Sequence, residues 1–228
     1  ATPLLSNRPS VVIGPACQGA RRVSGMDFSD FERLGDAVKR LHLKTHDQAG
    51  LFAACPEITP SEHLEQALRR GAPLASAIGT EKARSELIVA PFLPELKALA
   101  PETSFFSGID FTVDVASGLN GVCDFLISRA PEQFMLSAPV VALVEAKRDD
   151  IHEGLGQCVA EMVAAQLYNQ REGQSVAAVY GAVTTGSIWT FLRLTEMTLT
   201  IDLEEYMLAR PGRILGVLLA MATGSAPV

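Results

Sequence analysis

Two stretches of the sequence decide the fold: residues 121–128 read GVCDFLIS, and residues 140–147 read VVALVEAK. The first predicts a strand over Val122–Ser128, and the second, an apolar run, predicts a central strand over Val140–Lys147. Side chains two apart in a strand point to the same face, so Glu145 and Lys147 share one. A hairpin between the two strands would bring Asp124 beside them.

This polar cluster is costly unless it has a partner. Two close carboxylates repel each other, and a buried charge needs an ion pair or a metal. Mg²⁺ prefers one or two carboxylates together with waters and phosphate oxygens, as Asp124 and Glu145 could offer. Lys147 adds a positive charge that could orient an attacking water and offset negative charge in a transition state. The cluster therefore predicts a site for Mg²⁺ or Mn²⁺.

Helical and strand patterns surround these two strands. Apolar spacing predicts a helix over Phe28–Leu43. His42 and His46, four residues apart, are expected on this helix. The further predicted helices are Pro60–Arg70, one that begins at Thr80 and is interrupted by Pro91, and Glu153–Gln170; the further strands are Ser104–Val115, Val176–Thr184, Ser187–Leu194 and Leu199–Leu203. The order predicts an α/β fold with a mixed sheet.

Three regions are expected along the chain. Residues 1–25 are rich in Pro, Gly, Ser and Arg and predict a flexible N-terminal arm. Residues 26–79 predict a helical extension that could act as a cap or as an oligomerisation element of a homo-oligomer. Residues 80–228 predict the core that carries the polar cluster.

The residues around the cluster resemble a known family. The run GVCDFLIS followed by Val144-Glu145-Ala146-Lys147 resembles the D-x(n)-E-x-K signature of the PD-(D/E)XK nuclease superfamily, and within it a poorly characterised bacterial branch. Residues 156–162, GQCVAEM, resemble the helix that follows the E-x-K strand. The resemblance covers about residues 80–203. It implies a restriction-endonuclease-like mixed sheet flanked by helices, here with an N-terminal helical extension.

The resemblance also implies roles for individual residues. Asp124 and Glu145 would bind the metal, with the Ala146 carbonyl as a third ligand, and Lys147 would position the water. Gln157 would contact the substrate phosphate or the surroundings of Lys147. A carboxylate from the first core helix would be Glu86, with Glu81 as the second choice. Some branches place a tyrosine four residues after the glutamine, whereas this chain has Glu161, and spacing alone puts Gln157 and Glu161 on the solvent face of their helix.

Composition argues against some classes of protein but does not identify the function. The 228 residues carry a formal net charge of −7, so the chain lacks the basic excess typical of a nonspecific nucleic-acid coat. The four cysteines fit no zinc template and predict reduced thiols in a cytoplasmic protein, with Cys123 and Cys158 buried. No apolar run reaches the roughly 20 residues of a membrane helix.

Three functions remain open at this level. The first is a metal-dependent nuclease that hydrolyses phosphodiester bonds of nucleic acid, with DNA the expected substrate. The second is a catalytically degenerate nuclease fold that binds nucleic acid or a protein. The third is a self-associating scaffold in which the acidic cluster is only surface. The presence of all three of Asp124, Glu145 and Lys147 favours the enzyme.

Overall fold

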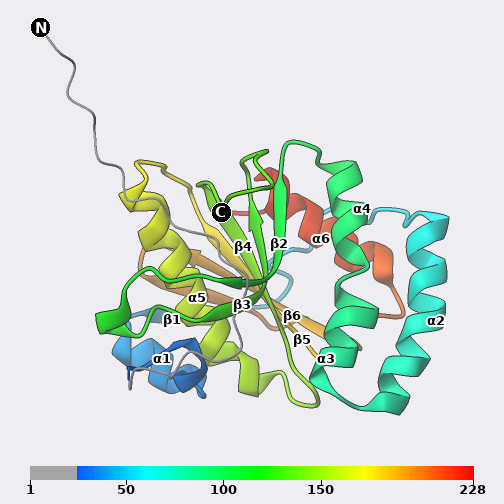
Figure 1. Cartoon of the computed structure of the whole chain (residues 1–228), viewed down its shortest axis with the longest axis horizontal. Helices are drawn as coiled ribbons and strands as arrows, with labels where there is room; N and C mark the ends of the chain where they lie inside the picture. Colours follow the sequence, from blue (N-terminus) through cyan, green and yellow to red (C-terminus); the bar gives the residue numbers. More distant parts are fainter. Residues whose placement is uncertain (1–24) are drawn as a thin grey trace, which may run out of the picture.

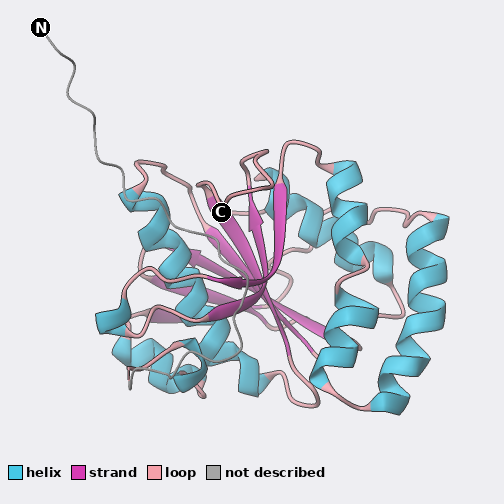
Figure 2. Ribbon diagram, in the orientation of Figure 1, coloured by secondary structure: helices cyan, strands magenta, loops and turns pink. Residues whose placement is uncertain are grey.

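A mixed β-sheet of eight strands runs through the part of the chain that the structure, a computed structural model, describes, residues 25–228 (Figures 1 and 2). Its order is β1-β7-β6-β5-β4-β3-β2, and the short β8 pairs with β6. The strands are β1 (Lys44–Gln48), β2 (Ser104–Asp110), β3 (Val122–Ser128), β4 (Val140–Ala146), β5 (Val179–Thr184), β6 (Ile188–Thr195), β7 (Thr198–Asp202) and β8 (Tyr206–Met207).

Helices cover both faces of this sheet. In Figure 1, α1 and α5 lie on one side, and α2, α3, α4 and α6 lie on the other. The helical elements are η1 (Phe28–Asp30), α1 (Leu34–Arg40), α2 (Glu62–Ile78), α3 (Glu81–Arg84), the π-helical turn η2 (Ser85–Val89), α4 (Phe92–Leu99), η3 (Val115–Ser117), α5 (His152–Arg171) and α6 (Pro211–Thr223). The predicted α/β class with a mixed sheet flanked by helices is confirmed.

The centre of the sheet follows the sequence pattern closely. β2, β3 and β4 form an antiparallel meander, and α5 then crosses over so that β5 pairs parallel with β4. Every residue of β4 and of β5 is buried, which explains the continuous apolar run of each strand. The predicted bounds of β3 are confirmed, and those of β4 and α5 are confirmed to within one residue.

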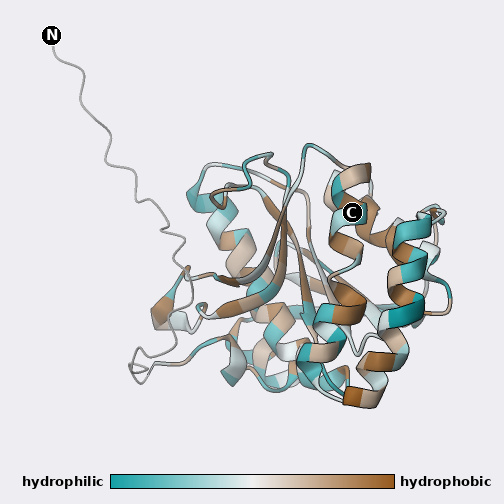
Figure 3. Ribbon diagram, turned by 45° about the vertical axis from the view of Figure 1, so that its right-hand side comes forward, coloured by the Kyte–Doolittle hydropathy of each residue, from teal (hydrophilic) through white to brown (hydrophobic). Residues whose placement is uncertain are grey.

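The sheet separates two hydrophobic cores. The core beneath α5 and α1 includes Phe31, Leu143 and Val159, and the core beneath α4 and α6 includes Phe92 and Trp189. Figure 3 shows hydrophobic strands in the middle, surrounded by helices that carry residues of both kinds. Residues of one strand therefore alternate between two buried environments, and a polar side chain on either face of the sheet must find a partner or a cavity.

The N-terminal part differs from the prediction of a purely helical extension. Residues 44–48 form β1, an edge strand that pairs parallel with β7 in the main sheet. Four of its five residues are exposed, so no hydrophobic alternation marks it in the sequence. His46 lies in this strand, while His42 lies in the preceding turn with a φ of 55°. The two histidines therefore do not share a helix, and the predicted arm, residues 1–25, lies almost wholly outside the described residues.

Two helices also differ from the sequence pattern. α2 continues to Ile78 with Pro73 inside it, although a break was expected near Gly71. Its buried face packs against η2, and a Cβ on Gly71 would lie 2.3 Å from the Leu87 carbonyl oxygen. This packing offsets the roughly 3 kcal/mol that an internal proline costs. α6, which was not predicted from the sequence, buries the apolar run Ile214–Ala222 against the sheet.

Two further sequence expectations concern cysteines and membranes. Cys123 and Cys158 are free and fully buried, as predicted, and Cys55 is also a buried free thiol. Cys17 lies outside the described residues. None of the helices within residues 25–228 combines the length and the apolar character that crossing a bilayer requires.

We expect Gly156→Ala to destabilise the protein by about 1–3 kcal/mol, the usual cost of overpacking a tight contact. A Cβ at this position would lie 2.2 Å from the Phe31 carbonyl oxygen, and neither backbone can yield easily. Urea unfolding measures the effect. Gly35→Ala is the matched control: its Cβ would meet nothing within 4 Å, so it should stabilise α1 slightly. Equal stability of Gly156→Ala and the wild type would refute the contact between α5 and residues 31–33.

Candidate active site

Asp124, Glu145 and Lys147 come together where β4 ends. Phe125 of β3 is paired with Val144 of β4, so Asp124 and Glu145 are the next residues along their two strands. The Lys147 Nζ lies 2.7 Å from Glu145 Oε1, and the Asp124 carboxylate accepts a hydrogen bond of 2.9 Å from the Ala146 N–H. The prediction that the three residues converge from adjacent strands is confirmed.

The Ala146 backbone also faces Asp124. Lys147 N–H donates to the Thr184 carbonyl of the β5 edge, so the neighbouring Ala146 turns its polar groups toward β3. The N–H and C=O of one strand residue project to the same side, which places the Ala146 carbonyl on the side of Asp124. Two carboxylates and one carbonyl oxygen are therefore grouped at this strand end.

Burial makes this group electrostatically unusual. Glu145 is only 2% exposed, and burial, with the Asp124 charge as a second cause, raises its pKa from the ordinary 4.5 to about 8. Burial also raises the pKa of Asp124, against the opposing effects of the Ala146 N–H and the Lys147 charge. Burial alone would lower the pKa of Lys147, but the charge and hydrogen bond of Glu145 outweigh it and raise that pKa. One ammonium group does not neutralise the surrounding carboxylates.

Gln157 extends the site onto α5. Its Oε1 accepts a hydrogen bond from Lys147 Nζ at 3.2 Å, and its Nε2 donates to Glu161 Oε1 at 3.0 Å. The sequence prediction that Gln157 contacts the Lys147 neighbourhood agrees with this geometry. Gly154 makes the approach possible, because a Cβ there would lie 2.9 Å from Lys147 Cγ.

Glu161 is the residue that sequence reasoning missed. It was expected on the solvent face of α5, but it is completely buried, and its Oε2 has no hydrogen-bond partner among the described residues. Burial and then the Glu145 charge raise its pKa well above the ordinary value. The expectation was wrong because Glu161 lies on the side of α5 that faces the sheet, close enough to Glu145 of β4 and Cys123 of β3 for their charges to interact. The four-residue spacing from Gln157 was the signal available in the sequence.

The two candidate helix glutamates lie differently from the sequence preference. Glu86 is paired with Lys82 at 2.8 Å, and its side chain is 59% exposed. Glu81, the first residue of α3, is the one whose charge acts on Glu145 and Lys147. Burial is the main cause that raises the pKa of Glu81, and the Lys147 charge opposes it. Electrostatics therefore couple Glu81 to the site more strongly than Glu86, although both line the same cavity as Asp124.

The donor set fits a hard divalent cation that also binds waters and substrate. Within residues 25–228, no three side chains of His, Cys, Asp or Glu are grouped closely enough to enclose a metal by themselves. Mg²⁺ does not need such a cage, because it retains several waters and uses one or two carboxylates. Glu145 Oε2 is fully buried and unpartnered, and a buried acceptor of this kind calls for a partner. Asp124, Glu145 and the Ala146 carbonyl could supply the protein ligands.

Replacing Glu161 by leucine should stabilise the metal-free protein by about 1–3 kcal/mol, because a buried carboxyl with an unpartnered oxygen is removed. The raised pKa of Glu161 means that the wild type loses stability as the pH rises above the ordinary range. The advantage of the leucine variant should therefore grow with pH. Thermal unfolding across the pH range measures it, and the exposed Glu172→Leu, which should change stability little, is the control. A less stable Glu161→Leu at high pH would contradict the assignment.

Comparison of the sequence with models of known families and with curated proteins gives no match.

Proposed function

We propose that this protein is a metal-dependent nuclease of the PD-(D/E)XK type, with Asp124, Glu145 and Lys147 as its catalytic residues and nucleic acid, DNA in the first place, as its substrate. The observation that carries the proposal is the grouping of the buried Glu145 carboxylate, the half-buried Asp124 carboxylate, the Ala146 carbonyl and Lys147 at the end of β4, with one Glu145 oxygen left unpartnered. The sequence signature predicts the same grouping.

The arrangement of elements gives further support. A helix, a three-strand meander, a second helix and a parallel strand follow one another from α3 to β5, in the order that a restriction-endonuclease-like core implies. Gln157 reaches Lys147 from the helix after the E-x-K strand, as the resemblance implied. The helices of residues 26–79 cover the sheet within the same fold, so the proposal does not need them as an oligomerisation element.

Each side chain has a separate role in this proposal. Mg²⁺ or Mn²⁺ on Asp124, Glu145 and the Ala146 carbonyl would supply Lewis acidity toward a phosphate oxygen. Lys147 would orient the attacking water and offset the negative charge that develops on the phosphate. Gln157 would fix the direction of the Lys147 ammonium through its hydrogen bond, and Glu161 would fix the Gln157 amide.

Calorimetric titration tests the metal site. Mn²⁺ should bind the wild type, and Asp124→Ala should weaken binding at least about tenfold because the ion loses an anionic ligand. Asp47→Ala, an exposed aspartate on the edge strand β1, should bind as the wild type does.

Cleavage assays with Mg²⁺ or Mn²⁺ then cover single-stranded, double-stranded and branched DNA and RNA. Cleavage that disappears in Asp124→Ala supports the nuclease. Metal binding without cleavage of any of these substrates would favour the degenerate module that binds nucleic acid or protein. Absence of metal binding in the wild type would refute both the cofactor and the nuclease.

A further inference from the structure

Two cavities open on either side of the catalytic group. The first, of about 470 Å³, lies between the segment around η1 and the start of α5, and Lys147 and Gln157 form part of its wall. The second, of about 270 Å³, lies between α3, η2 and the β2–β3 pair, and Asp124 and Glu81 form part of its wall. The two cavities share no lining residue, and Glu145, bonded to Lys147, stands between them.

Two glycines of α5 allow the walls of the first cavity to pack closely against the helix. Gly154 allows the Lys147 side chain to pack on the helix, and Gly156 allows the backbone of residues 31–33 to approach it. A Cβ on Gly156 would lie 2.9 Å from the Arg33 carbonyl oxygen. Residues 29–33 therefore form one wall of the cavity, and Lys147 belongs to the same lining. Arg33 and His152, together with Glu32 and Glu153, complete the polar lining.

The catalytic group itself is recessed. The side chain of Glu145 is 2% exposed and that of Lys147 is 15% exposed. A paired duplex is a stiff rod whose bases are held in the stack, so nucleotides of a duplex can enter deep cavities only after they are unpaired and flipped out.

We infer that the substrate crosses the catalytic group as an unpaired polynucleotide strand, with the nucleotides on the two sides of the scissile phosphate in the two cavities. The inference rests on the proposed function and adds the substrate class to it. The first cavity is lined mainly by polar groups and the second by polar and apolar groups in similar measure, which suits the polar edges and apolar faces of nucleotides. The first is within the size range of small-molecule sites, and the second lies just below it. Unpairing two nucleotides would disfavour a duplex by about 100-fold.

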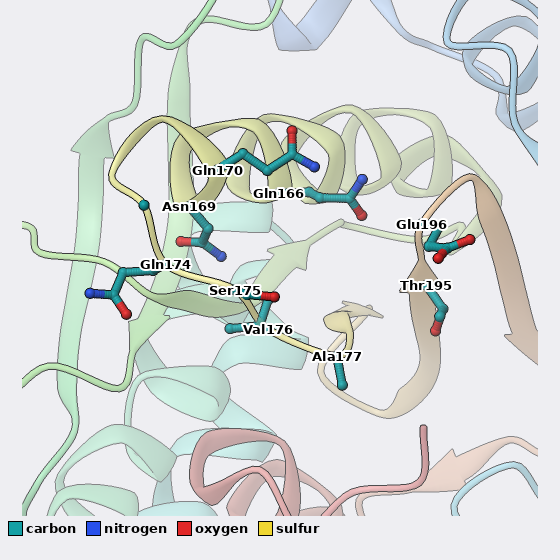
Figure 4. A pocket seen from close by; sticks show the side chains of 10 residues that line it. Gln166, Asn169, Gln170, Gln174, Ser175, Val176, Ala177, Thr195 and Glu196 are labelled. Atoms are coloured by element: carbon teal, nitrogen blue, oxygen red, sulfur yellow. The ribbon is translucent and has the colours of Figure 1, made fainter.

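A third cavity serves as an internal control. It has a volume of about 530 Å³ and lies at the other end of α5, where Gln166, Gln170 and Ser175 line it together with Thr195 at the end of β6 and Glu196 of the β6–β7 turn (Figure 4). None of the catalytic residues lines it. Filling it should not affect a strand that crosses the end of β4.

The experiment compares three serine-to-tryptophan variants at exposed positions, one for each cavity: Ser29→Trp, Ser107→Trp and Ser175→Trp. Each is assayed for kcat/KM with Mg²⁺, and for binding with Ca²⁺, on one labelled DNA strand offered alone and in its duplex. The wild type should prefer the single strand by about 100-fold. Ser29→Trp and Ser107→Trp should lose at least about tenfold on the single strand, and Ser175→Trp should behave as the wild type.

The outcomes separate this inference from the proposed function. The unpaired path is refuted if the wild type cleaves the duplex as well as the single strand or better. It is also refuted if all three variants cleave the single strand equally well. Neither result contradicts the proposed nuclease activity. If no substrate is cleaved, the nuclease fails and the Ca²⁺ binding decides. In that case, tighter binding of the single strand than of the duplex, lost in Ser29→Trp and Ser107→Trp, supports the unpaired path. If the wild type binds both forms equally, or if the two variants keep the preference, the unpaired path is refuted.

Discussion

Lys147→Ala should abolish phosphodiester cleavage, with a loss of at least about 100-fold in kcat, while Mn²⁺ binding changes by no more than a few fold. Lys147 donates to Glu145 and to Gln157, and the proposed metal ligands are other groups. Its removal would therefore take away the charge proposed to orient the water and leave the proposed ligands in place. Calorimetry for the metal and single-turnover cleavage for the chemistry are the two measurements.

The control for this variant is Lys39→Ala, an exposed lysine of α1, which should keep full activity. Ca²⁺ gives a second check: it should support binding of nucleic acid without cleavage, because it is larger and less demanding in geometry than Mg²⁺. If Lys147→Ala cleaves at the wild-type rate, Lys147 has no role in catalysis. Complete loss of Mn²⁺ binding would show instead that Lys147 organises the metal site.

Glu145→Gln should weaken Mn²⁺ binding by at least about tenfold and reduce cleavage in parallel, because a hard cation loses an anionic ligand. The same change should stabilise the metal-free protein, since burial and the Asp124 charge disfavour the ionised carboxyl. Lys147 partly compensates the charge of Glu145, and Glu81 and Glu161 add to the repulsion. Stability and function should therefore change in opposite directions.

The pH dependence of stability has a definite sign. The pKa of Glu145 is about 8 in the folded protein and 4.5 ordinarily, so between these values the folded state holds a proton that the unfolded state has lost. Stability contributed by this group is complete below pH 4.5 and is lost as the pH rises toward 8. The gain from Glu145→Gln should grow over that window in chemical unfolding without metal. The exposed Glu205→Gln should show no such trend, and a constant difference between Glu145→Gln and the wild type would contradict the burial argument.

The sequence by itself determined the centre of the fold and the grouping of Asp124, Glu145 and Lys147. β4 is a continuous apolar run because both of its faces are covered, and β3 is bounded by a glycine turn and a polar loop. Such signals are local, so no knowledge of distant residues is needed to recognise them. The spacing of Glu145 and Lys147 followed from the two-residue period of a strand, and the hairpin supplied Asp124.

The tertiary structure alone decided the remaining features, because each depends on contacts between residues far apart in the chain. β1 is polar and exposed, and it is a strand only because β7 offers a free edge. α2 passes through Pro73 because its buried face has η2 to pack against. Glu161 is buried because its side of α5 faces the sheet, and Glu81 couples to the site because α3 begins beside it. Helical spacing gives the direction of a side chain relative to its own helix, but only packing decides whether that direction meets solvent, a core or a catalytic group.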